Sequence, residues 1–223
     1  MNGHAVSLSM RFLHRIYPLT MTTQPRRTQQ DRVEESSRRL AEAAVALIAE
    51  QGYGATTAQQ IGLRAGYSRD MVRVRFGTKE ALVDSILKTL YEDRFTAAPA
   101  EGASGAELLL QSIRELREFA IADPVLLRAM FVLYFEAIQA DDLLRKRVTE
   151  WLDTSTRSFL SAIRIGQADG TIDRDLPAIE LSTELLSTLI GYAYLWIVNP
   201  AAFDLAGALD AWLTKLARTL RPS

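Results

Sequence analysis

The chain has 223 residues, 48% of them hydrophobic, and a net charge of −1, so it can form one large or two smaller folded domains and is not a generic polyanion binder. It contains no cysteine, which excludes disulfides, thiolate nucleophiles and cysteine zinc sites and agrees with a cytoplasmic location. Its histidines, His4 and His14, precede the expected folded part, which then lacks an imidazole for catalysis or metal binding; we expect no enzyme, metal or cofactor.

The first 30 residues are expected to form a flexible basic tail. Met10 and Met21 are alternative start positions, and Arg26 and Arg27 leave open an arm that enters a DNA minor groove. The opening 20 residues lack the continuous apolar run of a signal peptide. No unbroken apolar stretch reaches about 18 residues, so we expect no membrane partner.

Four helices are predicted in residues 31–92, each starting at a residue that favours the N-cap position. Thr57 and Gln60 have the spacing of a capping box, and Gly52 and Gly77 end the helices before them. The expected helices run from Asp31 to Gly52, from Thr57 to Gly66, from Ser68 to Phe76 and from Thr78 to Tyr91.

Residues 93–104 have the composition of a linker, and the pattern after them is again helical. Asp123 followed by Pro124 marks one of the helix starts. The expected helices here cover about 107–122, 124–139, 142–167, 177–198 and 205–220. The sequence therefore predicts an all-α fold of about nine helices, with an amino-terminal domain at 31–92 and a second domain at 104–223.

The segment 56–76 has the pattern of a helix-turn-helix: a short helix, a glycine turn and a second short helix rich in arginine. The part of the chain that contains this segment is also the more basic part. Residues 1–97 carry 14 Lys and Arg against 10 Asp and Glu, whereas residues 98–223 carry 12 against 17. A basic amino-terminal part on a nearly neutral chain indicates that this part contacts DNA phosphate.

The helix expected at 68–76 is predicted to present its first turn to base edges in a major groove. Arg69 suits a guanine, and Asp70 suits a cytosine amino group. Met71 or Tyr67 suits a thymine methyl group, and later arginines and neighbouring helix starts suit phosphate. The expected DNA-binding residues are Thr57, Gln59, Tyr67, Ser68, Arg69, Asp70, Met71, Arg73, Arg75 and Lys79.

A specific set of residues in this region has a familiar arrangement. They are Gly52, Thr56, Thr57, Ile61, Ala65, Gly66, Ser68, Phe76 and the run Thr78 to Leu82. In these positions residues 31–92 resemble the amino-terminal domain of the tetracycline-repressor (TetR) family of transcriptional regulators. The resemblance implies a homodimer that binds a near-palindromic double-stranded DNA operator and usually represses. It also implies that a small molecule in the carboxy-terminal domain releases the DNA.

The chain departs from the family pattern at several positions. Arg73 and Arg75 stand where aromatic residues or histidine are common, and arginine keeps a phosphate-binding role there. Gly62 replaces a common alanine and is expected to loosen its helix by up to about 1 kcal/mol. Tyr67 and Asp70 replace smaller residues, and the carboxylate of Asp70 is unfavourable at DNA unless it reads a base.

Large aromatic and apolar side chains gather on three of the later helices. They are suited to line a mostly apolar ligand cavity, and ordinary core packing is the alternative. Arg128, Tyr134 and Glu136 are the polar candidates to orient a ligand. The expected ligand-binding residues are Met130, Phe131, Tyr134, Phe135, Trp151, Phe159, Tyr192 and Trp196.

The helix expected at 177–198 is apolar around most of its circumference, which indicates burial on more than one side. With the last helix it is the expected dimer surface, and a central place in its own subunit is the alternative. The whole interpretation is a homodimeric, ligand-responsive, DNA-binding transcriptional regulator. An adaptor with a degenerate DNA-binding head is the second hypothesis, because of Asp70.

Overall fold

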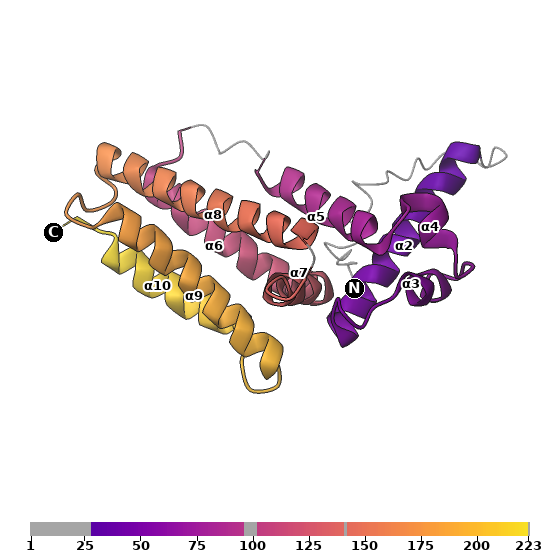
Figure 1. Ribbon diagram of the computed structural model, residues 1–223. Helices are drawn as coiled ribbons and strands as arrows, with labels where there is room; N and C mark the ends of the chain where they lie inside the picture. Colours follow the sequence, from indigo (N-terminus) through magenta and orange to yellow (C-terminus); the bar gives the residue numbers. More distant parts are fainter. Residues whose placement is uncertain (1–27, 96–101, 141, 223) are drawn as a thin grey trace, which may run out of the picture. The chain divides into compact units, whose positions relative to one another are not determined.

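The computed structural model describes residues 28–95, 102–140 and 142–222 (Figure 1). Within these ranges all regular structure is helical, which confirms the predicted all-α class of about nine helices. The helices are α2 (Gln29–Gln51), α3 (Ala58–Arg64), α4 (Met71–Phe76), α5 (Lys79–Phe95), α6 (Gly105–Ala122), α7 (Pro124–Glu136), α8 (Asp142–Asp169), α9 (Ala178–Val198) and α10 (Leu205–Thr219). The predicted tail lies outside the described residues up to position 27.

The helices group into two compact units. The first contains α2, α3, α4, α5, α7 and the start of α8 up to residue 147. The second contains α6, the rest of α8, α9 and α10. The domain boundaries expected from the sequence, 31–92 and 104–223, remain predictions.

Most of the expected helix boundaries follow from local capping chemistry. The hydroxyl oxygen of Thr57 accepts a hydrogen bond from the Gln60 N–H at 3.2 Å, and the Gln60 side chain accepts from the Thr57 N–H at 2.8 Å. Thr78 caps α5 through the Ala81 N–H, and Asp123 caps α7 ahead of Pro124. Each cap satisfies a backbone N–H that the first helical turn leaves without a partner.

Two predicted N-caps, Asp31 and Ser68, are wrong, and the helix expected from about residue 107 begins at Gly105. Asp31 and Glu107 are the third residues of α2 and α6, where each carboxylate accepts a hydrogen bond from the backbone N–H of the residue before the helix. The caps are Thr28 and Ser104, so both helices begin earlier in the chain than predicted. Ser68 does not cap α4, because its carbonyl oxygen accepts from the Met71 N–H in a turn instead.

The core of the first unit is built where α2, α3, α4 and α5 meet (Figure 1). Its fully enclosed members come from all four helices: Leu40, Ala44, Ile61, Val72 and Leu82. Thr56 is buried beside them, and its hydroxyl donates to the Gly52 carbonyl oxygen at 2.6 Å, which closes the turn between α2 and α3. The core thus fixes the short α4 against longer helices, since a helix of this length is unstable alone.

Gly62 lies where α3 crosses the segment that leads into α4. A Cβ atom at this position would approach the Ser68 carbonyl oxygen closer than the 3.0 Å that real Cβ atoms keep. The Gly62 carbonyl oxygen also accepts from the Tyr67 N–H at 2.9 Å, so the two backbones are in direct contact. Glycine at position 62 lowers the stability of α3 by up to about 1 kcal/mol, but it allows the segment before α4 to pack directly on α3.

The second unit has its own close backbone approach, between α6 and α8. A Cβ atom on Gly105 would collide with the backbone of Gly166 and with the Ala162 carbonyl oxygen. Asp169 holds this end of α6 by accepting from the Gly105 N–H at 2.8 Å. The hydroxyl of Thr171, followed by the N–H groups of Gly105 and Thr171, holds the pKa of Asp169 below its usual value.

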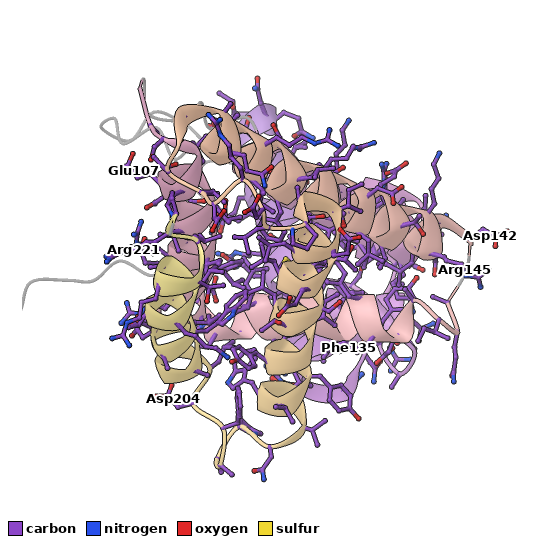
Figure 2. All side chains as sticks on the ribbon, turned by 90° about the vertical axis from the view of Figure 1, so that its left-hand side faces the viewer. Glu107, Phe135, Asp142, Arg145, Asp204 and Arg221 are labelled. Carbon is purple, nitrogen blue, oxygen red and sulfur yellow. The ribbon has the colours of Figure 1, made fainter. Side chains whose placement is uncertain are left out.

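Helices α9 and α10 pack side by side and are joined by a short turn (Figure 1). Asp204, labelled in Figure 2, caps α10 by accepting from the Gly207 N–H at 3.1 Å. Among the described helices, α9 alone is long and apolar enough to span a membrane by length and composition. One such helix is weak support for a span, because the core helix of a folded protein meets the same criteria.

Candidate nucleic-acid interface

Helix α4 has one face in the core and one in solvent. Val72 is completely buried, whereas the side chains of Arg73 and Asp70 are 73% and 72% exposed. Arg69 is also exposed and forms no ion pair or hydrogen bond with another described residue. Val74, which was not among the predicted DNA-binding residues, is 66% exposed. We call Arg69, Asp70, Arg73 and Val74 the α4 exposed face.

Asp70 and Arg73 form an ion pair one helical turn apart, with 3.8 Å between the carboxylate Oδ1 and the guanidinium Nε. Both side chains are largely in water, where such pairs contribute at most about 1 kcal/mol. The pair is therefore weak enough to open when a stronger partner, such as a phosphate, approaches Arg73.

Tyr67 and Met71 have a different environment from the α4 exposed face. Both are half-buried and pack against the core of the first unit. This packing fixes α4 on α3 and uses part of the surface that was predicted to touch a thymine. The expectation that they also contact bases remains a prediction.

Three of the predicted phosphate-binding residues form hydrogen bonds with other residues of the first unit. The Arg75 Nε donates to the Ser36 hydroxyl on α2 at 2.8 Å, and other N–H groups of the guanidinium are not used in this bond. The Lys79 Nζ donates to the Tyr53 carbonyl oxygen at 3.0 Å and lies 3.8 Å from the centroid of the Tyr53 ring. The third residue, Thr57, is occupied by its capping box, and its hydroxyl donates to the Gln60 side chain.

Of the remaining polar residues of α3, Gln59 is available to bind DNA and Arg64 is not. Gln59 is exposed in the first turn, as a phosphate contact requires. Arg64 forms two hydrogen bonds with Glu50 of α2, at 2.7 and 3.1 Å, and these hydrogen bonds lower the pKa of Glu50. Arg64 therefore has a partner within the protein and is not a member of the candidate interface, in agreement with its omission from the predicted set.

Helix α7 contacts the head through polar groups that the sequence could not place. The Arg128 Nε donates to the Ala49 carbonyl oxygen in the last turn of α2, at 3.0 Å. The Glu136 carboxylate accepts from the Gly54 N–H at 2.9 Å. These two residues were considered as ligand-orienting groups, and in the structure they bind the end of α2 and the turn after it.

A second link within the first unit joins α5 to the start of α8. Arg147 donates two hydrogen bonds to the Asp84 carboxylate, one from Nε and one from a terminal nitrogen. Arginine can form this bidentate pair and lysine cannot. A small pocket beside this pair is lined by Tyr53, Glu80, Val83, Asp84, Leu87, Leu143, Leu144 and Arg147. No group of metal-binding side chains occurs among the described residues.

Comparisons with known proteins agree with this geometry. The model of the family described as "Bacterial regulatory proteins, tetR family" matches residues 40–86, which contain the helix-turn-helix and most of the core of the first unit. The regulator TtgR of Pseudomonas putida, described as an HTH-type transcriptional regulator, is 26% identical over 202 residues, covering 84% of this chain and 92% of TtgR. The first unit therefore carries the pattern of the TetR family's amino-terminal domain, and the chain is similar to a TetR-type regulator over most of its length.

Solved structures of TetR-family proteins share the fold. A bacterial regulatory protein in the tetR family from Rhodococcus RHA1 has a TM-score of 0.67 at 18% identity, covering 84% of this chain and 98% of that one. NalD, the secondary repressor of the MexAB-OprM multidrug efflux pump in Pseudomonas aeruginosa, has a TM-score of 0.62 at 20% identity, covering 84% and 98%. These similarities are to regulators of transcription, and they indicate a transcriptional regulator rather than an enzyme.

The ligand-binding residues expected from the sequence fall in both units. In the first unit, α7 carries a largely buried aromatic cluster: the Phe131 and Tyr134 rings meet edge to face at 5.7 Å, and Phe131 stacks with Phe135 at 6.4 Å. Figure 2 labels Phe135 on this helix. Met130, on the same helix, is 6% exposed. These four side chains are thus brought together by α7, and whether they line a ligand cavity remains a prediction.

The other four expected ligand-binding residues lie in the second unit. Tyr192 packs against Phe203 at 5.8 Å and Trp212 at 6.0 Å, between α9 and α10. These two neighbours were not among the predicted ligand-binding residues. Phe159 is buried, while Trp151 and Trp196 are half-buried. Tyr192 thus serves the contact between the last two helices.

Proposed function

We propose that the chain is a homodimeric repressor that binds near-palindromic double-stranded DNA through α4 of each protomer. The observation that carries the proposal is the α4 exposed face, where charged side chains stand on a short helix whose other side is locked in the core. Such an arrangement suits a helix that enters a major groove, because the buried side sets its position and the exposed side meets base edges.

The charged members of this face suit different parts of the DNA. Arg69 is exposed and without an intramolecular partner among the described residues, as a side chain that forks onto a guanine requires. Arg73 can exchange its weak pair with Asp70 for a phosphate, and Asp70 is then available to accept from a cytosine amino group. Gel retardation with the DNA upstream of the chain's own gene tests the proposal, and unretarded DNA would favour the adaptor hypothesis.

The carboxyl half of α9 supports pairing of two copies. Gly191, Tyr194, Leu195 and Val198 recur at helical spacing and are exposed, so they form one continuous stripe. By contrast, the four leucines on which the expectation was based are all buried inside the unit: Leu181, Leu185, Leu186 and Leu189. The proposed dimer surface is therefore the exposed stripe, in contact with its own copy about a two-fold axis.

Replacing Leu195 by glutamate is expected to convert the dimer into monomers. The side chain is 49% exposed in the protomer, so the protomer should keep its fold while the proposed interface gains two buried charges. Light scattering would measure the mass, and the affinity for upstream DNA should fall because two linked heads bind more tightly than one.

Ile138→Glu is the matched control, because Ile138 is 82% exposed just after α7 and lies outside the stripe. This variant should remain dimeric and bind DNA as the wild type does. A Leu195→Glu protein that stays dimeric would contradict the proposed surface.

We propose further that a small, mostly apolar or aromatic molecule releases the repressor from DNA in the cytoplasm. A ligand beside the aromatic cluster of α7 could shift this helix. The hydrogen bonds of Arg128 and Glu136 would pass that shift on to the end of α2 and the turn after it. A coupling of about 1–3 kcal/mol, typical of such systems, would change the affinity for the operator roughly 5- to 150-fold. That the structural relative NalD is a repressor agrees with the proposed direction of control.

A further inference from the structure

Val74 occupies an unusual position on α4. It follows the completely buried Val72 by two residues, so it projects about 200° around the helix axis from the core. Its side chain is 66% exposed, and the charged Asp70 lies one turn before it on the same face. The α4 exposed face therefore has an apolar member among its charges.

A single exposed apolar residue on a protein surface needs no explanation. Val74 differs because α4 is only six residues long and its exposed positions are few. Valine is also a poorer helix former than the arginines beside it, so local helix stability does not favour it at an exposed site. Nor does the core require it, because Val72, Met71 and Phe76 make the contacts of α4 with the rest of the head.

The major-groove edge of DNA offers one apolar group for such a side chain, the 5-methyl group of thymine. Of the apolar residues in and before α4, Tyr67 and Met71 are partly held by the core, whereas Val74 is free of it. We propose that Val74 is a specificity-determining residue that contacts a thymine methyl group in the operator. The proposal depends on the proposed DNA-binding function and assigns the thymine contact to Val74 in place of Met71 or Tyr67.

The side chain of Val74 suits this task physically. A β-branched residue on a helix has one strongly preferred χ1 rotamer, so its two methyl groups keep a fixed direction without further support. Burying one methyl group against another apolar surface is worth about 0.8 kcal/mol, which is about a four-fold change in affinity. Two half-sites in a dimer would bring this to about fifteen-fold.

The test uses a duplex that the wild-type protein selects from a pool of random synthetic DNA. Each thymine of the selected sequence is then replaced, in both half-sites, by deoxyuridine, which lacks only the methyl group. The wild-type affinity, measured by fluorescence anisotropy, should fall about fifteen-fold at one symmetric pair of thymines and change little at the others. The Val74→Ala variant should bind the thymine and uracil duplexes with equal affinity.

Two further variants separate the alternatives. Met71→Ala should keep the thymine preference, and loss of the preference in this variant but not in Val74→Ala would overturn the proposal. Ile138→Ala removes an even more exposed apolar side chain from outside α4 and should leave both affinities unchanged. Thermal melting would show that Val74→Ala remains folded, as expected for an exposed position.

The same experiment distinguishes failure of the Val74 contact from failure of the proposed DNA-binding function. If a sequence is selected but no thymine-to-uracil change alters the wild-type affinity, the role of Val74 is refuted and DNA recognition stands. If the wild-type protein selects no sequence at all, both are refuted.

Discussion

Replacing Arg69 and Arg73 together by alanine is expected to lower the affinity for the selected duplex by at least about 100-fold. A well-placed arginine on a guanine contributes about 1–3 kcal/mol of discrimination, and a dimer loses this contact twice. The two lost phosphate contacts of Arg73 should also lower the slope of log affinity against log salt by about 2. Anisotropy titrations at several salt concentrations would measure both effects.

The matched control for this variant is Arg64→Ala, which removes an arginine from the same head. Arg64 is exposed but paired with Glu50, so its loss should change DNA affinity less than about two-fold and leave the stability of the protein nearly unchanged. An equal loss of affinity in the control would mean that general positive charge, and not the α4 exposed face, binds the DNA.

Replacing Gly105 by alanine is expected to destabilise the protein by about 3 kcal/mol. The added methyl group would meet the backbone of Gly166 and the Ala162 carbonyl oxygen, and these atoms cannot move aside as a flexible side chain does. Overpacking of a core typically costs about 1–3 kcal/mol, and a backbone collision lies at the upper end. Chemical denaturation would measure the difference in the free energy of unfolding.

Helix propensity alone predicts the opposite sign, since alanine is favoured over glycine inside a helix by up to about 1 kcal/mol. The sign of the measured change therefore decides between local propensity and the packing of α6 on α8. Gln111→Ala, at an exposed position of the same helix, should change stability by less than about 0.5 kcal/mol. Increased stability in Gly105→Ala would show that the two helices do not pack this closely.

The features that could be predicted from the sequence are those set by neighbours in the chain. Thr57 and Gln60 are three residues apart, and the periodic apolar positions of α2 are close to one another along the helix, so their roles follow from spacing. The errors at Asp31 and Glu107 are also local. In both cases a better cap stood three residues earlier, and the acidic residue was its partner.

The features that could not be predicted depend on which distant segments meet. Gly62 is only a weak helix former until Ser68 is seen across from it. Arg128 and Glu136 were candidates to orient a ligand because nothing in the sequence indicates that α7 lies on the end of α2. Val74 is an intermediate case: its outward direction follows from its place two residues after Val72, but only the structure shows that Val72 is in the core.

The measurement that tests the central claim most directly is selection of duplexes by the wild-type protein from a pool of random DNA, followed by sequencing. The account predicts one enriched near-palindrome, whose half-sites are spaced by about one helical turn or a multiple of it. It also predicts that the Arg69→Ala/Arg73→Ala variant enriches no sequence while melting at the wild-type temperature. An equal enrichment by this variant, or no enrichment by the wild type, would contradict recognition of DNA through α4.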